Sequence, residues 1–440
     1  MSRAAGIINN NVAKNNNFVS ETIVSQNLRG LKSESRLEEL FFGLRNRKLL
    51  AICMQETWRT PDTLKNGNCR IFLAGLKKED MKSNRGEQGV GIALSEQGVE
   101  AWKEAGKTLH DDLGGRIIAV RLKLDDDKRR PVNIFLVSAY CPVGKADPEL
   151  WEEFFERLDT CMSRKVKDDI LMIGMDSNSS IGTMKRDDHP DMTAVGPYGL
   201  NHINAAGERL RTYLEVNNLV SLTTYFKKSA YATWIHPRSK KPHQIDHFIT
   251  SKSDFKRIVD AGRTNPILDS DHLAIKCKLR VAVRLKKRST SARQQLLKLD
   301  TAMLKDQGKA SEFCQLVAEK YNLDGSASDT YTKLSSAMEA AAKEKLPVKP
   351  KAQPSWFLAS EEKLSKLVED RNAAMSSHFK HRTRSVATRL RTARKNLKRA
   401  VAEAKNNWIK EKCKQMNEGC MQRGTGQCWK ALSEIKKRAV

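Results

Sequence analysis

The sequence contains Gln244-Ile245-Asp246-His247-Phe248 and, farther along, Ser270-Asp271-His272. Each segment borders an apolar run that is typical of a buried strand, from Ile245 to Thr250 and from His272 to Val281. An acidic residue at the end of one strand and an Asp-His pair at the start of the next can bring two carboxylates and an imidazole together. We therefore begin the interpretation of the fold from these two segments.

Four earlier segments have the same arrangement. Asn27 ends the run from Ile23, Glu56 ends the run from Leu50, Tyr140 ends the run from Phe135, and Asp176 with Asn178 follows Ile170 to Gly174. In each case a polar group lies where a buried strand ends, which is where open sheets place ligand chemistry. The pattern predicts one site built from many strand ends. Its carboxylates and imidazole suit phosphodiester hydrolysis on a divalent cation.

The charge of the chain indicates a polyanionic partner. The 440 residues carry a formal net charge of +27, and 39% of them are hydrophobic. From Val281 onward there are 35 Lys and Arg against 16 Asp and Glu, a net of +19, whereas the part before it has 44 against 36. Basic side chains that neutralise phosphates gain affinity by releasing counterions. Anionic membranes would satisfy the same composition, but no apolar run is long enough for a spanning helix, so we expect no membrane partner.

The cysteines and the first residues indicate an intracellular protein, and we expect it in the nucleus. Residues 1–17 are rich in Asn and lack the apolar core of a secretory signal. The nine cysteines are an odd number without paired spacing, which favours reduced thiols. Cys413, Cys420 and Cys428 resemble a zinc cluster only loosely, because they include no close pair and no fourth ligand.

Apolar alternation and turn residues predict more strands than helices before residue 284. Strands are expected at 18–26, 50–56, 90–94, 116–124, 135–140, 170–175, 233–235, 245–250 and 272–281, helices at 35–47, 148–164 and 203–217, and a loop at 60–67. Ser35 with Glu38 offers a capping box for the first helix, and Asp147 with Pro148 begins the second. Because neighbouring strands often look antiparallel, we expect an α+β fold with two packed, mostly antiparallel or mixed sheets flanked by helices.

From residue 284 the composition changes to linkers and basic helices. Lys286 to Ser291 and Leu346 to Pro354 have the composition of linkers. Apolar residues at alternating spacings of three and four predict a coiled-coil seam on a helix rich in Arg and Lys; they are Val386, Leu390, Ala393, Leu397, Ala400, Ala404 and Trp408.

Seven short motifs occur in an order that is recognisable. They are Asn27 in Ser25-Gln26-Asn27-Leu28-Arg29-Gly30, Gln55-Glu56, Ala139-Tyr140-Cys141-Pro142, Asp176-Ser177-Asn178, Thr233-Trp234, Ile245-Asp246-His247 and Ser270-Asp271-His272. This order resembles the endonuclease/exonuclease/phosphatase superfamily, and most closely the apurinic-type endonuclease domain of non-LTR (LINE-type) retrotransposons. The resemblance covers about residues 18–281. Residues 354–429 look like the segment that precedes reverse transcriptase in such polyproteins, which implies a fragment or a domesticated derivative of such an element.

The resemblance implies a four-layer sandwich, and together with the composition of the chain it gives a domain order. Residues 1–17 would be a disordered N-terminus, 18–283 the endonuclease/exonuclease/phosphatase domain, 284–355 a linker with short helices, and 356–440 a basic helical region. The implied activity is that of a Mg2+-dependent DNA endonuclease. It would nick target DNA and leave a 3′ hydroxyl for target-primed reverse transcription, while the basic C-terminal helices would add contacts to RNA.

The resemblance also implies a role for each motif residue. Glu56 would be the main ligand of Mg2+, for which Mn2+ can substitute, with Asn27 and Asp271 in or near the same shell, because a hard cation takes oxygen ligands. Asp176 would deprotonate the attacking water, and Asn178 would orient it. The phosphate and substrate contacts would come from the remaining residues: His272 paired with Asp246 as a cationic donor, Tyr140 as a hydroxyl donor, and Thr233 with Trp234 nearby.

Each residue also has a purely structural interpretation. Asn27 and Asn178 could be turn residues, Glu56 a solvated strand end, and Tyr140 a core aromatic. His247 should be structural, because it adjoins Asp246 and points to the opposite face of the strand. Two other functions stay open: a catalytically decayed module that binds nucleic acid, and a phosphatase or phosphodiesterase on a small or lipid substrate.

Overall fold

The protein is described by a computed structural model. The structure describes residues 19–77, 79, 88–124, 132–143, 146–184, 193–281, 304, 306–321, 327–345 and 356–423. The chain divides into two compact units, of which the first comprises residues 1–284 with 356–440 and the second comprises residues 285–355.

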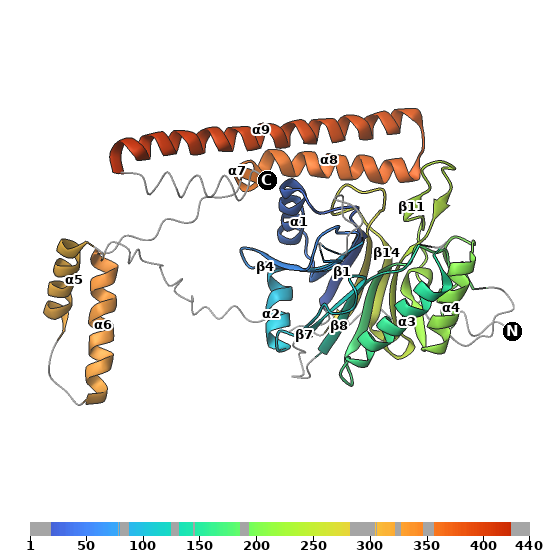
Figure 1. Ribbon diagram of the computed structural model, residues 1–440, viewed down its shortest axis with the longest axis horizontal. Coiled ribbons are helices and arrows are strands. Elements are labelled where there is room, and N and C mark those ends of the chain that lie inside the picture. Colours follow the sequence, from blue (N-terminus) through green and yellow to red (C-terminus); the bar gives the residue numbers. More distant parts are fainter. Residues whose placement is uncertain are drawn as a thin grey trace. The chain divides into compact units, whose positions relative to one another are not determined.

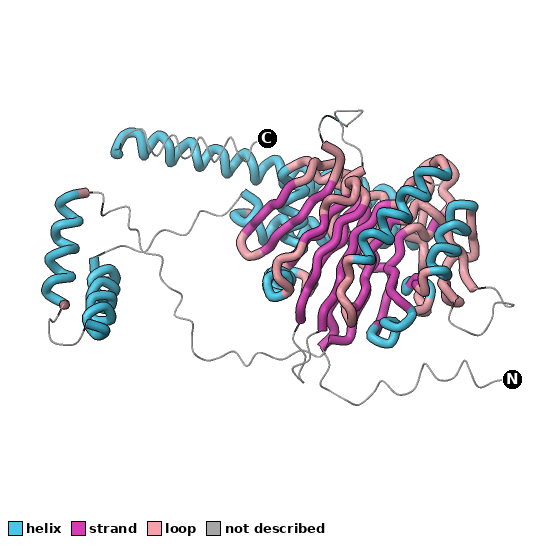
Figure 2. The backbone as a smooth tube through the Cα atoms, turned by 60° about the horizontal axis from the view of Figure 1, so that its bottom comes forward, coloured by secondary structure: helices cyan, strands magenta, loops and turns pink. Residues whose placement is uncertain are grey.

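Two mixed β-sheets form the centre of the first unit (Figures 1 and 2). The first sheet contains, in spatial order, β14 (Ile258–Arg263), β15 (Ile275–Val281), β1 (Val19–Asn27), β2 (Ala51–Gln55), β5 (Val90–Leu94), β4 (Cys69–Ala74) and β3 (Asp62–Asn66). The second contains β10 (Leu219–Ser221), β13 (Asp246–Ser251), β9 (Ile170–Asp176), β8 (Val132–Tyr140), β7 (Ile117–Leu124) and β6 (Leu109–His110). Within them, β1 and β2 are parallel, as are β8 and β9, and the other pairs are antiparallel.

The sheets and helices of the first unit form four layers. Inner faces of both sheets share one core, which includes Ile23, Phe72, Leu136 and Phe248. The helix α1 (Glu34–Asn46) packs on the outer face of the first sheet. The helices α3 (Pro148–Ser163) and α4 (Ala205–Val216) pack on the outer face of the second sheet, and α2 (Glu96–Glu104) contributes to the core between the sheets. The expected α+β sandwich is confirmed.

Most expected elements form, and the differences have local causes. The helix α1 begins after Ser33, whose hydroxyl accepts from the amide of Arg36, so the expected capping box at Ser35 is wrong by two residues. The expected loop at 60–67 is wrong, because it contains β3, an exposed edge strand whose sequence Asp-Thr-Leu-Lys-Asn has little apolar content. The last strand begins at Ile275, since His272 forms only an isolated bridge to Trp234. The helix α3 begins at Pro148 after the cap Asp147, as expected.

A helical hairpin from the C-terminal region packs on this sandwich (Figure 1). It consists of α7 (Trp356–Ala359), α8 (Glu361–Lys380) and α9 (Arg384–Arg423). The expected seam is confirmed where its residues Leu390, Leu397, Ala400 and Ala404 are buried.

The hairpin is joined to the sandwich by two apolar clusters and a buried ion pair. Phe42 of α1 belongs to the cluster that contains Leu397, and Leu273 belongs to the cluster that contains Leu390. The guanidinium of Arg371 on α8 lies 2.5 Å from the carboxylate of Glu39. Apolar burial of this kind stabilises the hairpin on the sandwich.

The second unit contains two helices that pack against each other, α5 (Gln307–Lys320) and α6 (Ala327–Lys345). Two ion pairs link α5 to the C-terminal end of α6, between Lys320 and Glu344 at 2.9 Å and between Lys345 and Glu312 at 3.6 Å. Across the described residues of both units, no helix combines the length and the apolar character that a membrane span requires.

Candidate active site

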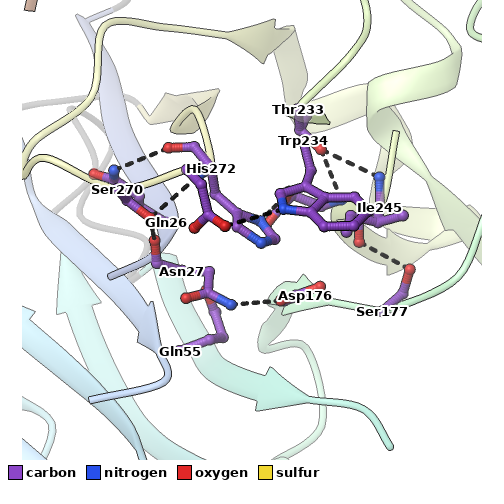
Figure 3. Close-up of polar contacts among 12 residues, drawn as sticks. Gln26, Asn27, Gln55, Asp176, Ser177, Thr233, Trp234, Ile245, Ser270 and His272 are labelled. Carbon is purple, nitrogen blue, oxygen red and sulfur yellow. Dashed lines mark hydrogen bonds and ion pairs between the residues drawn. The ribbon is translucent and has the colours of Figure 1, made fainter. Parts of the chain in front are cut away.

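The ends of five strands bring the expected site residues together. Asn27 is the last residue of β1, beside Gln55 of the parallel strand β2, and Glu56 follows directly. In the second sheet, Tyr140 at the end of β8 lies beside Asp176 at the end of β9, and Asp246 at the start of β13 faces Asp176 from the other side. The parallel pairs of both sheets end at the same edge of the sandwich. Figure 3 shows Asn27, Asp176 and His272 turned toward one another there.

Asn27 connects the carboxylates of the two sheets. Its side-chain amide donates to Glu56 Oε1 at 2.9 Å and to Asp176 Oδ2 at 2.8 Å. The hydroxyl of Tyr140 donates to the same Glu56 oxygen at 3.0 Å. Burial, and then the negative charge of Glu56, raise the pKa of Tyr140, so its hydroxyl stays protonated as a donor. Glu56 has a left-handed backbone with φ of 50°, a conformation that side chains adopt rarely and mostly at functional sites.

His272, Asp246 and Asp176 form a buried polar cluster. Each side chain offers one atom that could bind a metal ion, a ring nitrogen or a carboxylate oxygen, and these three atoms lie within 4.8 Å of one another. His272 Nδ1 lies 3.0 Å from Asp246 Oδ2 and 3.3 Å from Oδ1. Burial alone would lower the pKa of His272, but the charge and the hydrogen bond of Asp246 raise it to about 10. The imidazole is therefore a cation at neutral pH, and its Nε2 remains as a second donor.

Asp176 is the carboxylate of the cluster whose pKa is raised. Its side chain is fully buried, and burial followed by the nearby Asp246 carboxylate raises the pKa above its ordinary value. His272 and the amide of Asn27 act in the opposite direction. A carboxylate with a raised pKa is better matched to accept a proton near neutral pH than an ordinary one.

Asp271 carries an oxygen that has no hydrogen-bond partner among the described residues. Its Oδ2 accepts from Arg29 at 2.9 Å and from the indole of Trp234 at 3.2 Å. Its Oδ1 is buried without a hydrogen bond. A buried carboxylate oxygen without a partner costs free energy, and a bound cation would remove that cost. Together with Glu56 and the amide oxygen of Asn27, it is an oxygen donor of the kind that Mg2+ prefers, so the residues fit a hard divalent cation.

The remaining expected residues hold backbone in place. Asn178 Nδ2 donates to the carbonyl of Cys141 at 2.9 Å, and its backbone amide donates to Asp176 Oδ1 at 3.0 Å. The hydroxyl oxygen of Thr233 accepts from the amides of Ile245 and Asp246, each at 3.2 Å. In the structure Thr233 thus fixes the first residue of β13, and Asn178 fixes the end of β9.

A cleft opens over these strand ends. It is lined by Arg29, Glu56, Trp58, Gln88, Arg116, Tyr140, Val143, Asn178, Ser180, Asn204, Trp234, Pro237, His243, Ile245, Asp271 and His272. Arg29, Trp58 and Arg116 were not expected from the sequence. Arg29 was visible in the motif that contains Asn27, but its ion pair with Asp271 depends on tertiary structure.

Gln26, which precedes Asn27 in the first motif, has a role in this site that the sequence did not predict. Its amide nitrogen donates to the carbonyls of Leu268 and His272, and its oxygen accepts from the amides of Ile267 and Leu268. Gln26 is fully buried, so these bonds have no competition from water. They fix the segment that presents Asp271 and His272.

His247 is buried on the other face of β13. Its Nδ1 lies 3.0 Å from the hydroxyls of both Ser221 and Thr223. Burial lowers the pKa of His247 to about 4. It is therefore a neutral core residue, in agreement with the structural interpretation of its sequence position.

Sequence comparison gives distant curated relatives. No protein-family model matches the chain. Craniofacial development protein 2 of Bos taurus is 28% identical over 179 residues, which are 40% of this chain and 28% of that protein. The same protein of Tragulus javanicus is 28% identical over 165 residues, 37% of this chain and 28% of that protein. The matches thus span less than a third of the length of these relatives.

Structure comparison gives solved nucleases and a phosphatase. The endonuclease domain of TRAS1, a telomere-specific non-LTR retrotransposon, has a TM-score of 0.41 and 17% identity over 60% of this chain and all of that chain. The 3′ phosphatase NExo from Neisseria bound to a product DNA hairpin has a TM-score of 0.41 and 18% identity over 59% and 99%. The APE2 catalytic domain of Xenopus laevis has a TM-score of 0.39 and 16% identity over 60% and 94%. By their names, these structural neighbours are an endonuclease domain of a retrotransposon, a 3′ phosphatase and the catalytic domain of APE2.

Proposed function

We propose that the chain is a Mg2+-dependent DNA endonuclease that nicks its target and leaves a 3′ hydroxyl. The observation that carries the proposal is the contact of Asn27 with both Glu56 and Asp176, beside the buried pair of Asp246 and His272. Carboxylates, a cationic imidazole and a hydroxyl donor at one cleft are the groups that phosphodiester hydrolysis requires.

The proposed roles divide between accepting a proton and binding the phosphate. Asp176 accepts the proton of the attacking water, for which its raised pKa is suited. His272 donates from Nε2 to a phosphate oxygen, and Asp246 holds the imidazole in this orientation as a cation. Tyr140 offers a hydroxyl whose high pKa keeps it a donor. Asn178 orients the Asp176 carboxylate, and Thr233 and Trp234 hold the wall of the cleft on the substrate side.

The proposed ligands of Mg2+ are Glu56, Asn27 and Asp271, with Mn2+ as a substitute. The unpartnered Oδ1 of Asp271 supports this set. A bound Mg2+ supplies charge neutralisation at the phosphate. The chain's own residues keep the ligands oriented, since Tyr140 and Asn27 donate to Glu56 and Trp234 and Arg29 donate to Asp271.

The wider biological role is part of the same proposal. Residues 18–283 would form the endonuclease domain, with the rest of the chain as linker and basic helical region. A nick with a 3′ hydroxyl could prime reverse transcription, which fits a retrotransposon-derived enzyme that acts in the nucleus. RNA is a second proposed partner of the basic C-terminal helices, because phosphate contacts by Lys and Arg do not distinguish the two nucleic acids.

A plasmid assay tests the proposal. The full chain should convert supercoiled plasmid to nicked circle with Mg2+ and lose this activity in EDTA, and a DNA polymerase should extend the nick from its 3′ end. Glu56→Gln should lower the rate at a given Mg2+ concentration, and more Mg2+ should restore part of it. Equal hydrolysis of inositol phosphates and plasmid would favour a phosphatase. A parent protein that retards DNA but does not nick it would favour a binding module.

A further inference from the structure

The first half of α9 is a basic surface without acidic residues. From Arg382, two residues before α9 begins, to Ala402 the sequence has eight Lys and Arg and no Asp or Glu. Three of the eight have partners: Arg394 pairs with Asp269, Arg399 pairs with Glu403, and Arg382 donates to a backbone carbonyl. The other five are exposed and form no ion pair within the described part of the chain; they are Arg384, Arg389, Arg391, Lys395 and Lys398.

Four of these five side chains lie on one face of the helix. Arg391, Lys395 and Lys398 follow Arg384 by seven, eleven and fourteen positions. At about 100° per residue, these positions fall within a sector of about 60°. Leu390 and Leu397 point away from this sector and are buried in the packing of the hairpin. We call Arg384, Arg391, Lys395 and Lys398 the basic stripe.

Contacts of the hairpin tie the start of α9 to the cleft. Arg382 donates to the carbonyl of Lys240 in the turn between β11 (Trp234–Ile235) and β12 (Pro242–His243), two short strands whose Trp234 and His243 line the cleft. Figure 1 shows the turn between α8 and α9 beside β11.

A second contact reaches the segment that carries the catalytic imidazole. Arg394 Nη2 lies 2.7 Å from Asp269 Oδ1, two residues before Asp271. Leu390 packs in one cluster with Leu273, the residue after His272. The helix that carries the basic stripe is therefore held against the wall of the cleft and against the segment from 269 to 273.

Cationic groups also concentrate at this junction. The pKa of His378 on α8 is lowered by burial and then by the charges of Arg394, Arg382 and Lys240. A positive potential that extends from a cleft attracts and holds a polyanion.

We infer that the basic stripe binds the phosphate backbone of the duplex DNA that occupies the cleft, on one side of the nicked bond. This inference rests on the proposed endonuclease function and deepens it. From Arg384 to Lys398 the helix rises by about 21 Å at about 1.5 Å per residue. That length matches about six base pairs of duplex at about 3.4 Å each. We expect the stripe to set affinity and not the chemical step, because the contacts of Asp176, Asp246 and His272 involve no residue of the stripe within the described part of the chain.

The test compares two pairs of substitutions on α9 in the full chain. Arg391→Gln with Lys395→Gln removes two charges from the basic stripe. Lys410→Gln with Lys414→Gln removes two exposed charges farther along the same helix. Both pairs are assayed on a duplex of about 30 base pairs and on one of about 10, each containing a sequence that the parent nicks in plasmid. The shorter duplex offers less backbone beyond the cleft, at about 3.4 Å per base pair.

The stripe pair should raise KM for the long duplex about tenfold with kcat unchanged, and it should reduce the slope of log affinity against log salt by about 2. On the short duplex the stripe pair should match the parent protein. The Lys410/Lys414 pair should match the parent on both duplexes. The inference would be overturned if the stripe pair and the parent had equal KM values for the long duplex, or if the stripe pair and the Lys410/Lys414 pair lost affinity equally. In either case the proposed nicking activity would still stand. Loss of single-stranded RNA binding with unchanged KM for DNA would also overturn it and assign the stripe to RNA.

Failure of the proposed function gives a different result. If the parent nicks no DNA, the endonuclease proposal fails, and retardation of the long duplex still reports on the stripe. Weaker retardation by the stripe pair than by the Lys410/Lys414 pair would then support DNA binding by the stripe without the endonuclease function. Equal retardation by the two pairs would reject both the endonuclease function and DNA binding by the stripe.

Discussion

Asp176 and Asp246 face each other directly across the antiparallel strands β9 and β13, although both carry buried carboxylates. Like charges opposite each other in a sheet are destabilising. His272 compensates for this, because its imidazole lies against Asp246 and is held as a cation, and Asn27 donates to Asp176. The repulsion between these two carboxylates is thus offset by His272 and Asn27, which the proposed reaction also needs.

Asp246→Asn should lower the nicking rate about a hundredfold, in the range found when one preorganised electrostatic contact is lost. The amide no longer stabilises the cation of His272, so less of the phosphate-binding donor is present. Single-turnover nicking of plasmid at saturating protein measures this effect. Circular dichroism should show an unchanged fold. A variant that nicks at the parental rate would remove His272 and Asp246 from the mechanism.

Gln26→Leu should reduce both stability and nicking. The leucine removes four hydrogen bonds to residues 267, 268 and 272 and leaves buried backbone groups without partners. Unsatisfied groups of this kind cost about 1–3 kcal/mol each. Urea unfolding should therefore show a loss of at least about 3 kcal/mol. The nicking rate of the folded variant should fall because Asp271 and His272 shift.

The control for Gln26 is Gln97→Leu, since Gln97 is exposed and makes one side-chain contact, to Glu21. It should leave stability and nicking close to those of the parent. If the two variants behave alike, Gln26 does not position the segment from 267 to 272.

Arg371→Met should destabilise the first unit by about 3–5 kcal/mol, because it leaves the carboxylate of Glu39 against the hairpin without its buried partner. The midpoint of urea unfolding measures the change. Arg389→Met on α9 is the matched control, because Arg389 is exposed and the described residues give it no ion pair. Equal urea midpoints for Arg371→Met and Arg389→Met would mean that the ion pair of Arg371 with Glu39 contributes nothing to stability.

His247 should make stability fall as the solution becomes acidic. Its pKa is about 4 in the folded chain, below the ordinary value of 6.5. Between these values the unfolded chain binds a proton that the folded chain does not, so the contribution present above pH 6.5 is lost as pH falls toward 4. From pH 7 to pH 4.5 the parent should lose about 2 kcal/mol more than His247→Asn, which cannot titrate. Parallel pH profiles of the two proteins would contradict the neutral, buried state of His247.

The strand ends and the buried hairpin seam could be predicted from the sequence because their signals are local. Apolar runs that end in Asn27, Glu56, Tyr140 and Asp176 show both where strands stop and which side chains lie there. The spacing of Leu397 and the other seam residues was enough to predict the buried face of α9.

The features that sequence could not give are long-range. Gln26 contacts residues more than 240 positions away, and its single amide carries no signal of that role. Contacts of Arg394 with Asp269 and of Phe42 with the C-terminal hairpin depend on how distant elements pack. The strand β3 was missed because an edge strand exposed to water lacks apolar alternation.

The most direct test of the account is the single-turnover rate at which Asp176→Asn nicks supercoiled plasmid with Mg2+, beside Asp168→Asn as an exposed control. If Asp176 is the group that accepts the proton of water, the rate should fall by about 10²–10⁴ while duplex affinity and the control stay at the parental level. An Asp176→Asn protein that nicks as fast as the parent would contradict the central claim.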